Sequence, residues 1–235
     1  AGARRRLAYH FLEVTRTADA NQQYRELEGD WAHLRAALDY AEAQDRELLS
    51  DLVLALKNYW SARGMAQERL TWNERAARAF ALPHFSDHLS SSPPDKPQGD
   101  TEGDSWAQRK VGLHLGHAGG AYCEMGQYQR AIEVYGRAVY ASRSSGDLAA
   151  EADHLSGIGL AYAGLGDIER AVDYQHQAVD LDRQSGNVAG ELAALGALGQ
   201  AYVCLKDPRR GIGYLQRAVA MAQGLEDHRA EGHWL

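Results

Sequence analysis

The chain has 235 residues, 45% of them hydrophobic and 24% charged, so it can bury a substantial core in one or two domains. Its formal net charge of −7 gives no general attraction to nucleic-acid phosphates or anionic membranes, and we expect it to bind neither. Two cysteines, Cys123 and Cys204, are too few for a disulfide framework, which favours a reducing cytoplasm. We expect both to be small buried hydrophobic side chains.

The N-terminal part, residues 1–84, is predicted to be helical. Apolar residues at helical spacing predict a helix over about 4–17, and YRELEGDWAHLRAALDYAEAQ repeats that spacing around Trp31. The next stretch, LLSDLVLALKNYWSARGMAQERLTWNERAARAF, indicates a helix, a stop at Gly64 and a second helix. Because Trp60 lies four residues before Gly64, we interpret this stretch as a diverged copy of the helix pair that recurs downstream.

A polar segment, residues 85–104, follows this helical region. Its sequence, FSDHLSSSPPDKPQGDTEGD, is rich in Ser, Pro, Gly and Asp and shows no apolar periodicity. Long loops of this kind are sometimes functional, but a solvated spacer is commoner. We therefore predict a flexible linker inserted between helices.

Residues 105–235 carry an internal repeat of forty residues. Tyr122, Tyr162 and Tyr202 mark it, since 162 − 122 and 202 − 162 are both forty. Small residues recur in the same register, at Gly119, Gly159, Gly199, Ala121, Ala161, Ala201, Ala131, Ala171, Gly211, Ala138, Ala178 and Ala218. Small positions that let two helices approach, with a large residue filling the neighbouring gap, are typical of an antiparallel helix pair.

Turn residues recur with the same period. Glycine stops and capping residues are expected to separate the helices, at Gly126, Gly166, Asp167, Asp207, Gly146, Asp147, Gly186 and Asn187. Leu115, Leu155, Leu195 and Leu235 share one position, so the sequence stops in the first helix of a further repeat. We therefore expect the chain to be a piece of a longer protein.

The stretch LSGIGLAYAGLGDIERAVDYQHQAV closely resembles the tetratricopeptide repeats, with their leucine, glycine, tyrosine, alanine, aromatic, alanine order. The resemblance implies an all-α fold, a right-handed α-solenoid of antiparallel helix pairs. Forty residues exceed the usual length of about 34, as in variants similar to those of kinesin light chains and cell-polarity adaptors. The late aromatic position holds Tyr135, then Gln175 and Leu215, and this affects local packing only.

A second resemblance covers residue 24 to about residue 75. Its tryptophan, leucines and alanines are similar to the start of the helical-repeat region in bacterial signal-transduction ATPases with numerous domains (the STAND class). His33 stands where asparagine is more usual. The chain itself has no GxxxxGK[ST] phosphate loop, so any ATPase activity is expected outside it.

We predict no catalytic, cofactor or metal site. The glycine-rich GLHLGHAGGAY lies within a predicted helix and lacks the strand of a dinucleotide fingerprint. His114 with His117, and His84 with His88, have spacings that place two imidazoles on one helical face. Neither pair has a third ligand, which favours ordinary polar histidines. No Ser/His/Asp arrangement is recognisable from spacing, so a non-enzymatic protein is expected.

The family resemblance implies that one face of each first helix lines a concave ligand groove. That face comprises Leu113, Gly116, Gly120, Cys123, Asp153, Ser156, Leu160, Ala163, Ala193, Gly196, Gln200 and Val203. Small residues there leave room for a peptide or helix to approach the backbone. They would equally relieve crowding in a tightly curved superhelix, and both interpretations stay open.

Arginine recurs near the start of each second helix, at Arg130, Arg170 and Arg210. Positive charge there opposes the helix dipole, so helix stability is no obvious reason for it. A docking stripe for an acidic partner is one interpretation, although a solvated or ion-paired face is commoner.

The predicted function is therefore a scaffold that binds a protein or peptide, or docks with other domains of its own longer chain. The second resemblance implies the sensor or regulatory region of a bacterial signalling or transcription-regulating ATPase. The alternatives are a stand-alone adaptor and a receptor for a small, pheromone-type peptide. An enzyme hidden in the solenoid is the least favoured, because no constellation of residues supports one.

Overall fold

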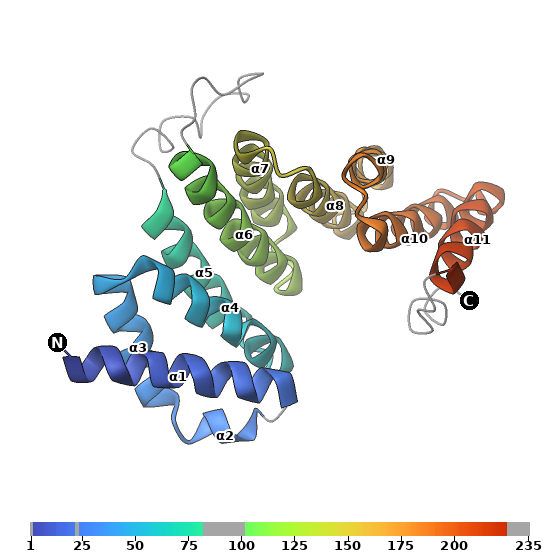
Figure 1. Ribbon diagram of the computed structural model, residues 1–235. Helices are drawn as coiled ribbons and strands as arrows, with labels where there is room; N and C mark the ends of the chain where they lie inside the picture. The colour runs from blue at the N-terminus through green and yellow to red at the C-terminus, as the bar shows by residue number, and fades with distance from the viewer. Residues whose placement is uncertain (1, 22–23, 82–101, 225–235) are drawn as a thin grey trace. The chain divides into compact units, whose positions relative to one another are not determined.

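The computed structural model describes residues 2–21, 24–81 and 102–224, which form helices joined by short turns. The chain divides into two compact units, Ala1–Ser90 and Ser91–Leu235, each with its own hydrophobic cluster (Figure 1). Within the described ranges there is no strand, and no helix has the length and apolarity needed to cross a bilayer. The predicted all-α fold class is confirmed.

The first unit packs around leucines and one tryptophan. It comprises α1 (Gly2–Asn21), α2 (Arg25–Glu28), α3 (Trp31–Gln44), α4 (Arg46–Ala62) and α5 (Ala66–Phe80). Helix α1 packs against α3 and α4, and α4 packs against α5. The core between them buries Leu34, Leu38, Leu49, Leu52, Leu56 and Trp60 completely.

Helices α4 and α5 are joined by the same turn as the downstream pairs. Gly64 is left-handed, with φ of +64°, and the Met65 N–H donates to the Trp60 carbonyl at 2.8 Å. The corresponding bond in the first downstream pair runs from Gln127 to Tyr122 at 2.9 Å. The tryptophan four residues before the glycine thus has the place that tyrosine has in the repeats.

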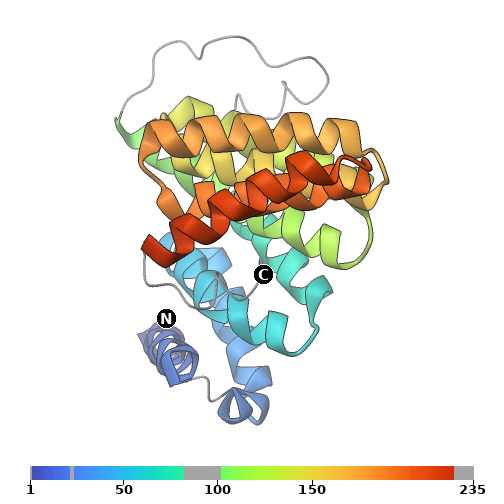
Figure 2. The same ribbon diagram turned by 90° about the vertical axis from the view of Figure 1, so that its right-hand side faces the viewer.

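The second unit consists of three helix pairs. They are α6 (Glu102–Glu124) with α7 (Tyr128–Ser145), α8 (Leu148–Gly164) with α9 (Ile168–Ser185), and α10 (Val188–Cys204) with α11 (Pro208–Gly224). Each second helix also packs against the first helix of the next pair, as α7 does on α8 and α9 on α10. Figure 2 shows these helices side by side, with their long axes running across the view. This stacking of pairs is the α-solenoid arrangement.

The turn inside each pair needs a left-handed residue. Gly126 and Gly166 have φ of +71° and +81°, as expected of glycines that end a helix. In the third pair Lys206 takes this place with φ of +61°, which is strained for a residue with a side chain. The carboxylates of Asp167 and Asp207 then accept the backbone N–H groups of the residues three positions on, which confirms the two predicted caps.

The turn between pairs is built the same way twice. Gly146 and Gly186 are left-handed, and the side chains of Asp147 and Asn187 cap the next helix. Across these turns an arginine in the last turn of a second helix bonds a glutamate of the following helix. The two pairs are Arg143 with Glu151 and Arg183 with Glu191, each at 2.6 Å between Nε and Oε1.

A glycine in each first helix faces the residue sixteen positions later in the second helix. The three pairs are Gly119 with Tyr135, Gly159 with Gln175, and Gly199 with Leu215. A Cβ at Gly119 would lie 2.9 Å from the Tyr135 ring, closer than packed atoms allow. Gly157 of α8 meets the same ring, and a Cβ there would lie 2.5 Å from it. Tyr135 is therefore half-buried and contacts both α6 and α8 at a glycine.

Two histidines of the second unit are buried, His114 on α6 and His154 on α8, where α8 meets α6. His114 is fully buried and His154 is 7% exposed. Burial lowers the pKa of His114 to about 3 and that of His154 to about 4, with a further lowering by the charge of His117. Among the described residues no group of three His, Cys, Asp or Glu side chains is placed to hold a metal. The pair His84 and His88 lies outside the described residues.

We expect Gly157→Ala to lower the free energy of unfolding by about 1–2 kcal/mol, because overpacking against Tyr135 outweighs the gain in helix propensity. Gly136→Ala is the matched control, since a Cβ there meets nothing within 4 Å. It should raise stability by about 0.5–1 kcal/mol. Urea denaturation measures both, and stabilisation by both substitutions would contradict the packing described for Tyr135.

We expect the second unit, which contains His154, to lose stability as the pH falls from about 6.5 to about 4. The unfolded chain takes up protons at histidine in that range, whereas the folded chain keeps His154 neutral. His154→Gln should reduce the loss by roughly 2–3 kcal/mol at pH 4. Urea titrations at several pH values measure this, with the exposed His10→Gln as control. An unchanged pH dependence in His154→Gln would contradict the assignment.

Candidate functional site

The first helices of the second unit form one layer. Helix α6 contacts α8, and α8 contacts α10, whereas the second helices of the described pairs make no contacts of this extent with one another. Each first helix carries a large apolar side chain with much of its surface in water. Leu113 of α6 is 38% exposed, Leu160 of α8 is 55% exposed and Val203 of α10 is 50% exposed. The layer therefore presents apolar groups that the unit itself does not cover.

The predicted groove residues differ in exposure. Leu113, Asp153, Leu160, Ala193, Gln200 and Val203 are exposed, Gly116, Gly120, Cys123, Ser156 and Ala163 are half-buried, and Gly196 is buried. The predicted ligand face thus includes one row, at residues 116, 156 and 196, that is less open than the others. The assignment of these residues to a ligand groove stays a prediction.

The less open row is occupied by contacts with neighbouring helices. A Cβ at Gly116 would lie 2.5 Å from the His154 ring of α8. Ser156 Oγ donates to Gln175 Oε1, and Gln175 Nε2 donates to the Ser156 carbonyl, both at 3.0 Å. Gln175 is 2% exposed, so these bonds satisfy an amide that would otherwise be costly to bury. From the sequence, Gln175 was only a departure from the aromatic pattern.

The recurring arginines make contacts within their own repeats. Arg170 pairs with the capping carboxylate of Asp167, and its guanidinium lies 4.4 Å from the centre of the Tyr162 ring. Arg210 repeats this with Asp207, and lies over the tyrosine of its own pair at 5.7 Å. Arg130 donates to the side-chain oxygen of Gln127 at 3.0 Å. These contacts supply a structural reason for positive charge at a helix start, and the docking stripe stays a prediction.

Three acidic side chains, Asp153 of α8, Asp182 of α9 and Glu191 of α10, lie near one another. Asp153 is exposed, and desolvation by the surrounding protein, followed by the charge of Asp147, raises its pKa. Asp182 of α9 is 2% exposed, and burial raises its pKa to about 6 despite the hydrogen bond from Asn187 Nδ2 at 2.8 Å. Asp153 and Glu191 raise the pKa of Asp182 further. An ionised Asp182 carboxylate is therefore poorly solvated.

The two cysteines differ from each other in exposure. Cys123 is half-buried, and burial raises the pKa of its thiol, followed by the charge of Glu124. Cys204 is exposed, so the expectation of a buried side chain is wrong there. The reason is its place at the end of α10, where the equivalent residues of the earlier pairs, Glu124 and Gly164, are exposed as well.

Comparisons with known proteins agree with this geometry. Residues 111–184 and 151–224 match the tetratricopeptide repeat family, which confirms the repeat assignment for this part of the chain. The fold is similar to that of apo RapI, with a TM-score of 0.72 and 13% identity over 97% of this chain and 74% of that one. No curated protein matches the sequence.

Two further solved structures share the fold. BtubC from P. vanneervenii has a TM-score of 0.67 and 18% identity, over 97% of this chain and 88% of that one. Nearly identical TPR-like repeats of a putative kinesin light chain from Podosopora anserina have a TM-score of 0.58 and 17% identity, over 93% and 95%. These likenesses concern the fold, and they establish a TPR-like α-solenoid.

We expect Asp182→Asn to raise the free energy of unfolding at pH 7 by roughly 1–3 kcal/mol, because an amide avoids the cost of ionising a buried carboxyl. The folded chain holds the Asp182 proton up to about pH 6, whereas the unfolded chain releases it near 3.8. Stability of the parent should therefore decrease as the pH rises through this range, and that decrease should be smaller in the variant. Chemical denaturation at pH 4, 6 and 7 measures it.

The exposed Asp173→Asn on the same helix is the control for this charge change. It should leave both the stability at pH 7 and its pH dependence nearly unchanged. Destabilisation by Asp182→Asn at pH 7 would show that the ionised carboxylate stabilises the junction of α9 and α10.

Proposed function

We propose that the layer formed by α6, α8 and α10 binds a segment of a partner protein or peptide. One observation carries the proposal: Leu113, Leu160 and Val203 are exposed on three successive first helices, although other faces of these helices are buried. Covering apolar surface is favourable by about 25 cal/mol per Å². One exposed apolar side chain on each of the three helices therefore favours a ligand that contacts several repeats at once.

The side chains around these three residues favour close approach. Gly120, Ala163 and Ala193 add little bulk, so a ligand backbone or helix can reach the repeat backbones between the larger side chains. Asp153 is the only charged residue of the predicted groove. Since its pKa is already raised by burial, a cation of the ligand placed beside it would stabilise the carboxylate. The ligand we propose has a mainly apolar surface with one basic group.

We further propose that this binding regulates a larger bacterial signalling or transcription-regulating ATPase. The support is the resemblance of residues 24–75 to the helical-repeat region of such proteins. Regulation requires that the ligand bind the active and inactive states of the longer protein with different affinity. The ligand is then a separate protein or peptide, or another domain of the same longer chain. A phosphate loop in the intact reading frame would distinguish this role from that of a stand-alone adaptor or small-peptide receptor.

We expect Leu160→Arg to abolish ligand binding while helical content stays unchanged, because it places a bulky charge on an exposed apolar position. The measurement has two steps. The 235-residue chain first captures a partner from lysate of its native cells, identified by mass spectrometry. The partner is then purified, and its affinity is measured for the parent and for the variants by calorimetry.

Gln177→Arg is the matched control, since Gln177 is exposed on α9 and its side-chain amide donates to a backbone carbonyl of its own helix. It should retain the parent affinity. Equal binding by the parent and Leu160→Arg would contradict the groove assignment. Equal loss in both arginine variants would indicate a nonspecific effect of charge and would also contradict it.

A further inference from the structure

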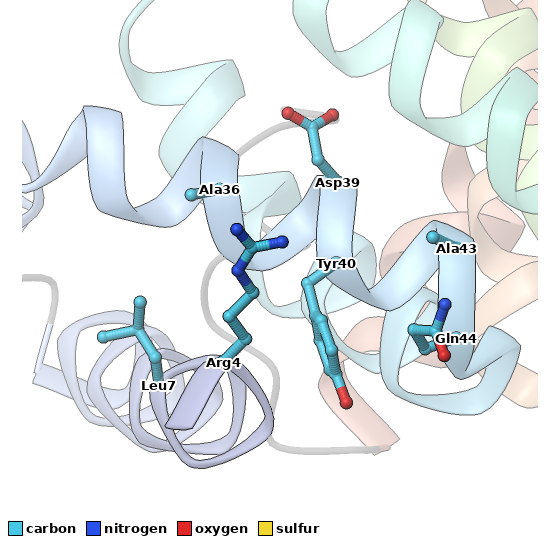
Figure 3. Close-up of a pocket in the computed structure, with 7 residues that line it drawn as sticks. All are labelled: Arg4, Leu7, Ala36, Asp39, Tyr40, Ala43 and Gln44. Carbon is cyan, nitrogen blue, oxygen red and sulfur yellow. The ribbon is translucent and has the colours of Figure 1, made fainter. Parts of the chain in front are cut away.

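The first unit contains a cavity of about 620 Å³ between α1 and α3, which is open to solvent and lined mainly by exposed residues. Its lining comprises Arg4 and Leu7 from α1, with Ala36, Asp39, Tyr40, Ala43 and Gln44 from α3 (Figure 3). Pockets that hold small molecules usually measure about 300–1,000 Å³. The cavity is therefore large enough for a small organic ligand.

Contacts outside the cavity hold its two walls together. The Phe11 ring of α1 stacks on the His33 ring of α3, with centroids 6.1 Å apart. The Tyr9 hydroxyl donates to Asp45, the residue between α3 and α4, at 3.4 Å. Because these contacts do not involve residues that line the cavity, a ligand can bind there without breaking them. Binding to a site whose walls are already held in place costs less free energy of ordering than binding to a site that must first become ordered.

The cavity combines an apolar surface with one charge of each sign. Leu7, Ala36 and Ala43 supply aliphatic surface, and the Tyr40 ring projects from α3 beside them (Figure 3). Arg4 extends from α1 toward α3 and makes no ion pair or hydrogen bond with another described residue. Asp39 accepts a long bond of 3.5 Å at Oδ1 from Arg75, which bonds Glu42 more closely. Its Oδ2 is left for another donor.

We propose that this cavity binds a short apolar zwitterion, of the class formed by apolar amino acids and di- or tripeptides. The terminal carboxylate pairs with Arg4, the terminal ammonium pairs with Asp39, and the side chains contact Leu7 and Tyr40. A ligand with only a negative charge is repelled by Asp39, and one with only a positive charge is repelled by Arg4. A ligand with both charges is the one that the lining complements.

The test titrates the 235-residue chain with leucine, Leu-Phe and Leu-Phe-Leu by calorimetry. We expect saturable binding of at least one of them. Its N-acetylated form and its C-terminal amide should each bind about two- to fivefold more weakly, as expected for loss of one partly exposed ion pair. Arg4→Gln should lower the affinity for the unmodified zwitterion by a similar factor. It should leave the affinity for the C-terminal amide nearly unchanged, because the amide has no carboxylate to pair with Arg4. Asp39→Asn should behave in the same way toward the acetylated form.

Two exposed residues of α1 that do not line the cavity provide matched controls. Arg6→Gln and Glu13→Gln make the same charge changes as the two test variants, and both should bind like the parent. Circular dichroism checks that all variants keep their helical content. Absence of saturable binding for all three probes would overturn the proposal. Equal losses of affinity in the test and control variants would overturn it as well. So would a loss from Arg4→Gln that adds to the loss from amidation, or a loss from Asp39→Asn that adds to the loss from acetylation.

This site is independent of the groove proposed above, because all its residues belong to the first unit. Leu160→Arg should not change the affinity for the short zwitterion. Failure of one proposal therefore leaves the other standing, and the two experiments tell them apart.

Discussion

The second unit depends on how closely the two helices of each pair approach. A glycine in the first helix lies against a large side chain sixteen residues later, and a Cβ at Gly119, Gly159 or Gly199 would overlap that side chain. This contact sets the distance between the two helices of each pair, although the large side chain differs from pair to pair: Tyr135, Gln175 and Leu215. Close packing explains why the small residue recurs with the period while its partner varies, since the partner only has to fill the space.

The same constraint leads to the proposed binding layer. Helices α7 and α9 each pack against two first helices, and the first helices α6, α8 and α10 also contact one another in sequence and form one layer. Their packed faces are rich in glycine and alanine, and the remaining face is left with Leu113, Leu160 and Val203 in water. A solenoid buries its core by stacking neighbours, and therefore retains an extended face that no element of its own covers.

The repeat also explains where charge is found. The arginine near the start of each second helix opposes the helix dipole, but Arg170 and Arg210 pair with the capping aspartate and lie over the tyrosine of the same turn. Arg143 and Arg183 instead lie in a last turn, where the dipole favours a cation, and also bond a glutamate of the next repeat. Most of these charges stabilise turns, which leaves the proposed groove nearly neutral.

The sequence by itself determined the helix pairs of the second unit, the turns at their glycines, and the caps at Asp147, Asp167, Asn187 and Asp207. Those features depend on local chemistry, since Gly126 needs no neighbour to turn left-handed and Asp167 caps a helix that begins beside it. Only the tertiary structure decided which groove residues are open, that Gln175 bonds Ser156, and that burial shifts the pKa of Asp182. It also decided that α1 and α3 line an open cavity. Burial and hydrogen bonding between helices depend on residues far apart in the chain, and a repeat period does not record them.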